Sequence, residues 1–259
     1  MLTNQMLENR KMPNGLSVIS TRFDPDGSCQ CCKLRKTCVA SRMGRETNKV
    51  FHQVTHRSLL IKHGEHLFYN GDPLRSVYIV KSGSFKSYII NHRADEQIIN
   101  FHLPGDILGF EALPSHLFES SVVALETASV CAIPVWQLEK MIEQLVPDWL
   151  MEIFMEKLKL QNRTASALGK KDARRRIASF LWDISENYQA LGYSGKNIKL
   201  NMSRQDIGNY LGLASETISR IFTKMKKDGL LKLNRRDVTI IDFDLLSELA
   251  DKDVSKSNI

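Results

Sequence analysis

Four of the five cysteines lie within ten residues, at Cys29, Cys31, Cys32 and Cys38, and the fifth, Cys131, follows 93 residues later. A packed core gives no reason for such clustering, whereas cysteine thiolates are ligands for zinc and for iron–sulfur clusters. The N-terminal sequence has no apolar core or small-residue cleavage site, so we expect no secretory signal and a cytoplasmic protein with reduced thiols. The cysteines therefore predict a metal site.

The spacing C-x2-C-x5-C of Cys29, Cys32 and Cys38, with Cys131 as a distant fourth, suits either zinc or an iron–sulfur cluster. The residues alone leave both open. No Cys-x-x-Cys-His occurs, which argues against a c-type haem. Cys31 is a fifth thiol for four positions, and we interpret it as a bystander because adjacent cysteines rarely reach one cluster together.

The excess positive charge has a definite location. The chain has 259 residues and a net charge of +7, and residues 170–237 hold 15 Lys or Arg against 7 Asp or Glu. The remainder is nearly balanced, so the last third has the charge expected of a nucleic-acid-binding domain. A solvated basic face would give the same charge count. No run of apolar residues is long enough for a membrane span, and we expect no membrane association.

The elements that must position these residues follow from the hydrophobic pattern. Residues 76–81, 85–90 and 97–102 are strand-length runs separated by Gly, Asn and Pro turns, which predict a small antiparallel barrel or roll. Helical periodicity begins at Val135, and a new helix begins at Pro147-Asp148 and continues for about 20 residues. Its apolar stripe, interrupted by Lys157 and Gln161, predicts a homodimer seam, with a core helix as the alternative.

The C-terminal third predicts a helix-turn-helix. Ser203 and Asp206 form a capping box that opens a helix to Leu211, Gly212 supplies the turn, and Ser215 is predicted to cap a second helix to Asp228. Residues 231–233 and 238–241 predict a two-stranded wing with a basic tip. This is the arrangement of a module that binds double-stranded DNA.

The second helix presents Glu216, Ser219, Arg220 and Thr223 on one face, since these positions are spaced i, i+3, i+4 and i+7. Arg220 can donate two hydrogen bonds to guanine, and Glu216 can accept one from the amino group of cytosine. Lysines of this helix, Lys224 among them, are better suited to phosphate contacts, which add affinity without sequence information.

The stretch Asp206–Arg220 resembles the signature of the cyclic-AMP receptor and FNR superfamily of bacterial transcription regulators, in its oxygen-responsive fumarate and nitrate reductase regulator branch. The resemblance covers the chain from about Cys29 to the wing. It implies an α+β fold with four parts: a cysteine segment (1–50), a β-roll sensor domain like a cyclic-nucleotide-binding jelly roll (51–146), a dimerisation helix (147–170) and a winged helix-turn-helix (171–259).

The resemblance also assigns sites. Cys29, Cys32, Cys38 and Cys131 become ligands of a 4Fe-4S cluster, with zinc as the alternative, and Glu216, Ser219 and Arg220 become readers of a TTGAT half-site. Phosphate contacts are expected from the remaining polar residues around the two helices: Ser203, Arg204, Ser215, Thr217, Thr223 and Lys224. Cyclic AMP is not expected, because the stretch from Glu119 to Val122 lacks the arginine that would meet its phosphate.

The function predicted from the sequence is therefore an oxygen-sensing regulator that dimerises with its cluster, binds palindromic DNA and controls anaerobic metabolism. By resemblance, RNA polymerase is a partner, with residues 109–115 as a candidate surface. A zinc-stapled regulator and a nitric-oxide-responsive regulator of the same fold are the alternatives. A redox enzyme is not expected, because the sequence has no nucleotide-binding glycine loop.

Overall fold

The computed structural model describes residues 58–142, 148–170 and 172–252, and in the N-terminal segment Cys32, Leu34 and Cys38. Cys29, Cys31 and Pro147, which the sequence predictions use, lie outside the described residues. The statements below concern the described part of the chain.

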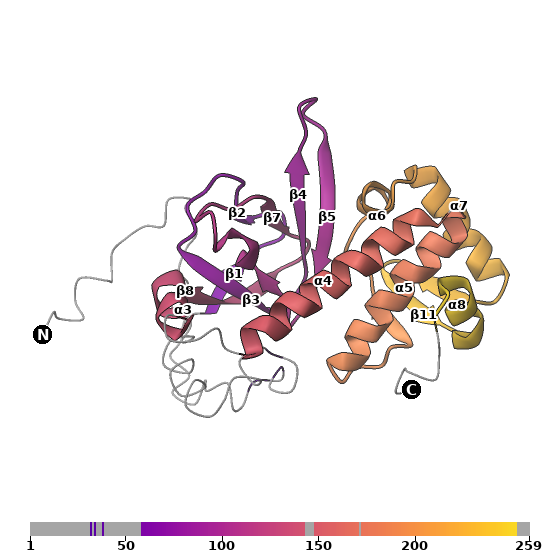
Figure 1. The fold of residues 1–259 in the computed structure, drawn as a ribbon. Helices are drawn as coiled ribbons and strands as arrows, with labels where there is room; N and C mark the ends of the chain where they lie inside the picture. The colour runs from indigo at the N-terminus through magenta and orange to yellow at the C-terminus, as the bar shows by residue number, and fades with distance from the viewer. Residues whose placement is uncertain are drawn as a thin grey trace, which may run out of the picture.

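Two four-stranded antiparallel sheets form the N-terminal roll (Figure 1). One sheet has the order β1-β8-β3-β6, from Ser58–Ile61, Ala128–Pro134, Ser76–Ser82 and Ile107–Leu108. The other has the order β2-β7-β4-β5, from His66–Phe68, Ser121–Ala124, Phe85–Ile90 and Glu96–His102. The β4–β5 hairpin extends beyond the rest of the roll, as Figure 1 shows.

The roll closes around one hydrophobic core because alternate strand residues face inward. Phe68 and Phe118 stack with ring centroids 3.7 Å apart. Gly83 lies in the turn between β3 and β4 with φ of +79°, and a Cβ there would lie 2.6 Å from the Cβ of Ala128. Only glycine satisfies both the positive φ and this close approach.

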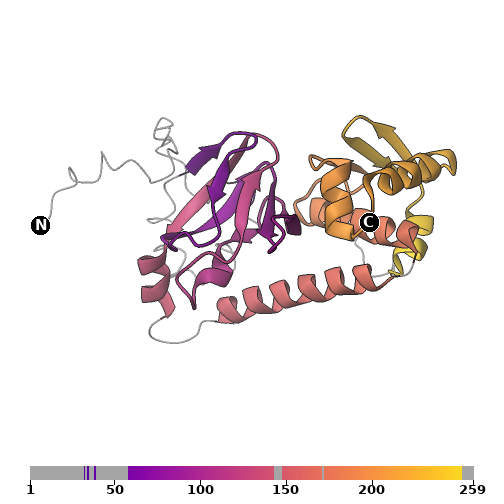
Figure 2. The ribbon, with the colours of Figure 1, turned by 90° about the horizontal axis from the view of Figure 1, so that it is seen from above.

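Helices then carry the chain from the roll to the C-terminal domain. After α3 (Val135–Ile142), the 22-residue helix α4 (Asp148–Gly169) runs along the roll and reaches the C-terminal domain (Figures 1 and 2). Leu150 and Ile153 are buried against the core of the roll. The α4 helix thus starts on one domain and ends beside the other.

The C-terminal domain has its own core, formed by helices packed on a small sheet. Its helices are α5 (Ala173–Ala190), α6 (Arg204–Leu211), α7 (Ser215–Lys227) and α8 (Phe243–Ala250). Its strands are β9 (Asn197–Lys199), β10 (Leu231–Asn234) and β11 (Asp237–Ile240), in the order β10-β11-β9. The predicted two-stranded wing is thus part of a three-stranded sheet, because β9 pairs with β11.

The helix-turn-helix consists of α6 and α7, and its close packing depends on glycine. Gly212 ends α6 with φ of +63°, and a Cβ on Gly208 would lie 2.5 Å from the carbonyl oxygen of Leu213. The capping box of Ser203 and Asp206 is present. The prediction that Ser215 caps the second helix is wrong, because Ala214 is the N-cap residue and makes no side-chain cap.

The predicted fold class is confirmed: a β-roll, a long helix and a C-terminal helix-turn-helix make up an α+β protein. One detail of α4 differs from the sequence interpretation. The Nζ of Lys157 donates to the carbonyl oxygen of Ile107 at 3.1 Å and lies 3.6 Å from a carboxylate oxygen of Glu111. Lys157 therefore faces the roll and does not interrupt the exposed apolar stripe.

Candidate nucleic-acid interface and sensor residues

The α7 helix has two contrasting faces. Ile218, Phe222 and Met225 are buried in the core of the C-terminal domain. On the other side Glu216, Ser219, Arg220 and Thr223, the four residues predicted to share one face of the helix, are all exposed. The packing of the apolar face therefore holds α7 so that this row of polar side chains is open to solvent.

The hydroxyl groups on the exposed face of α7 bond to the helix itself. The Oγ of Ser219 donates to the carbonyl oxygen of Ser215 at 3.0 Å. The Oγ1 of Thr223 donates to the carbonyl oxygen of Ser219 at 2.9 Å. Both hydroxyl protons are thus used within the helix, which leaves oxygen lone pairs for partners that donate.

Two predicted phosphate contacts at the start of α6 have structural roles. The Oγ of Ser203 donates to Asp206 Oδ2 at 2.6 Å and accepts from the Asp206 backbone N–H, so it belongs to the capping box. The guanidinium of Arg204 lies 3.7 Å from the ring centroid of Phe222, and burial lowers its pKa. This cation–π contact joins α6 to α7.

The remaining predicted phosphate contacts lie along α7. Ser215 is its first residue, Thr217 is half-buried in its first turn, and Lys224 is exposed near its end. Lys226 and Lys227 are also exposed, and the last turn of α7 therefore carries three lysines. The turn between β10 and β11 adds the exposed pair Arg235 and Arg236, with Arg235 at a φ of +53°.

Three of the four predicted cluster ligands fall within the described residues. Cys32, Cys38 and Cys131 are thiols and half-buried. Cys131 lies in β8, paired with Ser58 of β1 on one side and with Ile79 of β3 on the other. Cys38 and Cys131 both pack against the core of the roll.

The described residues do not assemble a metal site by themselves: among them, no three His, Cys, Asp or Glu side chains are grouped so as to hold a metal ion. Cys29, a predicted ligand, and Cys31, the predicted bystander, lie outside the described residues. The donor set nevertheless suits an iron–sulfur cluster chemically, because the three described cysteines are thiols.

A polar junction between the roll and α6 was not predicted from the sequence. The Nζ of Lys86 on β4 lies 2.8 Å from Asp206 Oδ1 on α6 and 2.6 Å from Glu96 Oε1 on β5. The side-chain amide of Asn209 accepts from the Ile98 N–H at 2.8 Å and donates to the Glu96 carbonyl oxygen at 2.7 Å. Asn209 therefore occupies the hydrogen-bonding edge of β5 as a further strand would.

The charges at this junction stabilise one another. Burial alone would raise the pKa of Asp206, but the hydrogen bonds from Lys86 and Ser203 outweigh it, and the pKa is lowered. Burial alone would lower the pKa of Lys86, but its hydrogen bonds to Asp206 and Glu96 outweigh this effect and raise the pKa. Lys86 and Asp206 are therefore both ionised at neutral pH.

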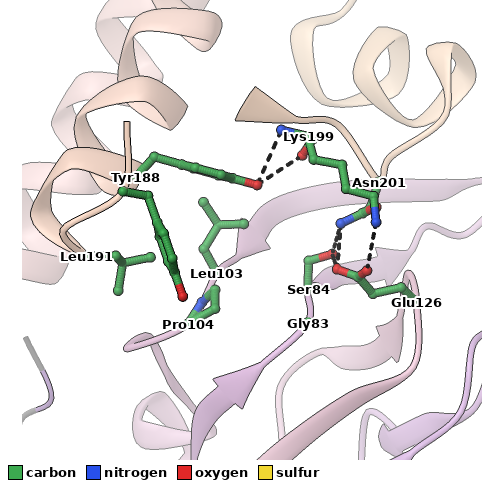
Figure 3. Close-up of a pocket in the computed structure, with 10 residues that line it drawn as sticks. Gly83, Ser84, Leu103, Pro104, Glu126, Tyr188, Leu191, Lys199 and Asn201 are labelled. Carbon is green, nitrogen blue, oxygen red and sulfur yellow. Dashed lines mark hydrogen bonds and ion pairs between the residues drawn. The ribbon is translucent and has the colours of Figure 1, made fainter. Parts of the chain in front are cut away.

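A second polar contact joins the domains beside a pocket of about 210 Å³ (Figure 3). The Nδ2 of Asn201 donates to Ser84 Oγ at 3.2 Å and to Glu126 Oε1 at 2.5 Å. Tyr188 lines the same pocket, with its hydroxyl bonded to the backbone of Lys199. Figure 3 shows Ser84 and Glu126 of the roll meeting Asn201 of the C-terminal domain across this boundary.

Aromatic side chains complete the junction. The ring of Phe101 on β5 lies 5.1 Å from Tyr210 of α6 and 6.0 Å from Phe180 of α5. The Tyr210 hydroxyl is 3.0 Å from the hydroxyl of Thr164 on α4. No local motif marks these residues in the sequence. The sequence signal that could have indicated this junction is Lys86, a cation in β4 between the buried residues Phe85 and Ser87.

Comparison with known proteins decides the family. Residues 175–249 match the Crp-like helix-turn-helix domain, and residues 59–145 match the cyclic nucleotide-binding domain. The chain is 37% identical to the transcriptional activator protein anr of Pseudomonas aeruginosa, over 90% of this chain and 96% of that protein. It is 36% identical to the fumarate and nitrate reduction regulatory protein of Escherichia coli, over 86% of this chain and 90% of that protein.

The chain belongs to the fumarate and nitrate reduction regulator branch of the cyclic-AMP receptor superfamily. The solved structure of FixK2 from Bradyrhizobium japonicum resembles it with a TM-score of 0.68 and 28% identity, over 74% of this chain and 96% of that one. As a member of this branch the chain is a transcription regulator that binds DNA through its helix-turn-helix, and it is not an enzyme.

Within the described ranges, no helix has the length and apolar character needed to cross a membrane. The stretch from Glu119 to Val122 is the one whose sequence argues against cyclic AMP binding. Ser120 and Ser121 in it are buried, and the Oγ of Ser121 accepts from the Asn70 N–H at 3.0 Å. The absence of a bound cyclic nucleotide stays a prediction.

Proposed function

We propose that this regulator senses oxygen through a 4Fe-4S cluster held by Cys29, Cys32, Cys38 and Cys131. In the cluster-loaded form it would be a homodimer that binds palindromic TTGAT-type sites and, with RNA polymerase, controls genes of anaerobic metabolism in the cytoplasm. The observation that carries the proposal is that Cys38 and Cys131, far apart in the sequence, pack against the same core of the roll.

Chemistry favours these ligands. Thiolates hold iron–sulfur clusters, and Lys33, Arg35 and Lys36 lie between the proposed ligands in the sequence, where their positive charge would offset the negative charge of a cluster with four thiolate ligands. When bound, the cluster supplies iron–sulfur chemistry that responds to oxygen. Cys131 would link the N-terminal segment to β8, in the middle of the sheet whose core also holds Leu150 and Ile153 of α4.

The α4 helix supports the dimer. Met151, Phe154, Met155 and Leu158 are 54%, 49%, 46% and 49% exposed, although they are large and apolar. Met151, Met155 and Leu158 lie on the side of α4 away from buried Ile153, and Phe154 lies at the edge of that side, with its ring 5.1 Å from the ring of Phe110 in the roll. We call these four residues the α4 stripe. A stripe of this length fits a second copy of the same helix and would bring two recognition helices together on a two-fold-symmetric site.

The proposed cluster can be tested by one anaerobic preparation. The purified protein is expected to be brown, with absorption that disappears in air, and to bind a duplex with two TTGAT half-sites more tightly before exposure than after. A matched Cys131→Ser preparation should be colourless, whereas Cys31→Ser should keep both colour and binding. A colourless wild-type protein that binds the duplex equally well before and after exposure to air would contradict the oxygen-sensing proposal.

Zinc remains the second candidate, because a four-cysteine set also suits tetrahedral zinc. Metal analysis of the same preparation separates the two. About one zinc per chain without iron would identify a zinc-stapled regulator of the same fold. Nitric oxide as the main signal would use the same cysteines and would show as loss of the cluster absorption under nitric oxide without oxygen.

The base-reading role of α7 is proposed for Glu216, Ser219 and Arg220, all on its exposed face. Arg220→Lys should cost about 1–3 kcal/mol of discrimination at the guanine of the half-site, because lysine lacks the two-pronged donor. The control is Lys224→Gln, which should weaken binding to every duplex equally and reduce the salt slope by about one. Competition binding against single-base variants measures both. If Arg220→Lys lost the same affinity for every single-base variant of the duplex, base reading by Arg220 would be contradicted.

A further inference from the structure

Thr223 lies on the exposed recognition face, but its hydroxyl is already committed. Its Oγ1 donates to the carbonyl oxygen of Ser219 at 2.9 Å. A hydroxyl has a single proton, and phosphate oxygens only accept hydrogen bonds. As long as this bond is kept, Thr223 cannot donate to a phosphate, which argues against the phosphate contact expected from the sequence.

The group that Thr223 can offer to a partner is its methyl group. Threonine is branched at Cβ, so holding Oγ1 against the backbone of α7 also fixes the direction of the Cγ2 methyl. Thr223 is exposed, two turns after Glu216 and one turn after Arg220, hence on the same face as both. The major groove offers an apolar partner there in the C5-methyl group of thymine.

We propose that Thr223 is a specificity-determining residue that reads a thymine through contact between its methyl group and the thymine C5-methyl. Ser219 is the natural comparison, because its hydroxyl is also bonded within the helix but it has no methyl group. Ser219 therefore presents an oxygen that accepts from a base, and Thr223 presents an apolar surface. The proposal rests on DNA binding by the helix-turn-helix and is independent of the cluster and of the TTGAT prediction.

The test uses the full-length protein, prepared anaerobically, and the tightest site recovered from a pool of random duplexes. Each thymine of one half-site is replaced in turn by deoxyuridine, which removes only the C5-methyl. For the wild type, one replacement should weaken binding about fourfold, the effect of one buried methyl group. Thr223→Ser should bind about fourfold more weakly per half-site than the wild type, and its affinity should not respond to that same replacement.

Thr223→Val separates the two roles of the side chain, because it keeps a methyl group and removes the hydroxyl. It should retain both wild-type affinity and the sensitivity to deoxyuridine. Thr217→Ser removes a methyl group off the recognition face and keeps the hydroxyl that is expected to contact phosphate. Whatever its effect on overall affinity, it should leave the deoxyuridine pattern unchanged. This control separates methyl reading from a general effect on α7.

The opposite pattern would overturn the proposal. Loss of affinity in Thr223→Val with retention in Thr223→Ser would identify a hydroxyl contact to phosphate. The proposal would also be rejected if no deoxyuridine replacement weakened binding of the wild type to the recovered site. It would be rejected as well if Thr223→Ser were as sensitive to deoxyuridine as the wild type. A failure of the TTGAT prediction appears separately, as a recovered site of another sequence.

Discussion

His102 is a buried titratable residue in β5, and its surroundings keep it neutral. Its Nε2 lies 2.9 Å from Ser87 Oγ, and burial, together with the charge of Lys157, lowers its pKa to about 3. An unfolded chain would bind a proton at this histidine near pH 6.5. The folded state does not, so the stability contributed by His102 is complete above pH 6.5 and is lost as the pH falls towards 3.

A pH series therefore tests the environment of His102. Between pH 8 and pH 5 the wild type should lose about 2 kcal/mol of unfolding free energy that a His102→Gln variant does not lose, because glutamine does not titrate. Urea unfolding at both pH values measures the difference, and glutamine keeps a polar group near Ser87. Equal losses in the two proteins would mean that His102 titrates normally in the folded state.

Among single residues, exposure on α7 could be predicted from spacing, because a helix puts i, i+3, i+4 and i+7 on one face whatever surrounds it. The capping box of Ser203 could also be predicted from spacing, and its hydroxyl bonds to Asp206 as expected. The contact made by Arg204 could not be predicted in this way. The Arg204 contact needs Phe222, which lies on the next helix.

At the scale of elements, α4 has two sides with different partners. Leu150 and Ile153 are buried with the roll, and Lys157 bonds to Ile107 and Glu111. Met151, Met155 and Leu158 of the α4 stripe are exposed on the other side, and Phe154 at its edge also contacts Phe110 of the roll. Exposed apolar patches of this kind mark interaction sites, so α4 is expected to transmit the state of the roll to a partner helix.

The α4 stripe gives a direct prediction for assembly. Leu158→Glu should shift the anaerobic protein towards monomer, since two buried carboxylates would face each other across a two-fold seam. Analytical ultracentrifugation over a concentration series measures the shift, which should exceed tenfold in dissociation constant. Ile241→Glu places the same charge at an exposed apolar position outside α4 and should leave the dimer unchanged. A monomeric wild type would remove the basis of this prediction.

At the scale of the whole molecule, the junction between β5 and α6 fixes the DNA-binding domain against the roll. Lys86 pairs with Asp206 and Glu96, and Asn209 bonds to the edge of β5. The side chains of Lys86 and Asp206 are 15% and 18% exposed. Solvent therefore screens this pair less than it screens a surface pair, and its loss should cost more than an exposed salt bridge does.

Removal of the Lys86 charge tests this coupling. Lys86→Met should weaken the docking of α6 by about 1–3 kcal/mol, because two carboxylates lose a shared cation. The backbone N–H of Ile98, which donates to Asn209, should then exchange with deuterium faster, as measured by hydrogen exchange. Lys81→Met, at an exposed position on β3, is the control. Unchanged exchange at Ile98 would show that the aromatic contacts of Phe101 hold the domains without the charges.

The secondary-structure elements, the helix-turn-helix and the cysteine ligand set could be predicted from local sequence patterns. Period-two strands, the Ser203 capping box and the glycine turn at Gly212 are properties of neighbouring residues, and so is the C-x2-C-x5-C spacing. Contacts between residues distant in sequence were not readable. The ion pair of Lys86 and Asp206, the strand-like pairing of Asn209, and the common core beneath Cys38 and Cys131 exist only after the two sheets close and α4 sets the domains side by side. Hydrophobic periodicity identifies which face of an element is buried but not its partner, because burial is non-directional and partner choice depends on packing of the whole chain.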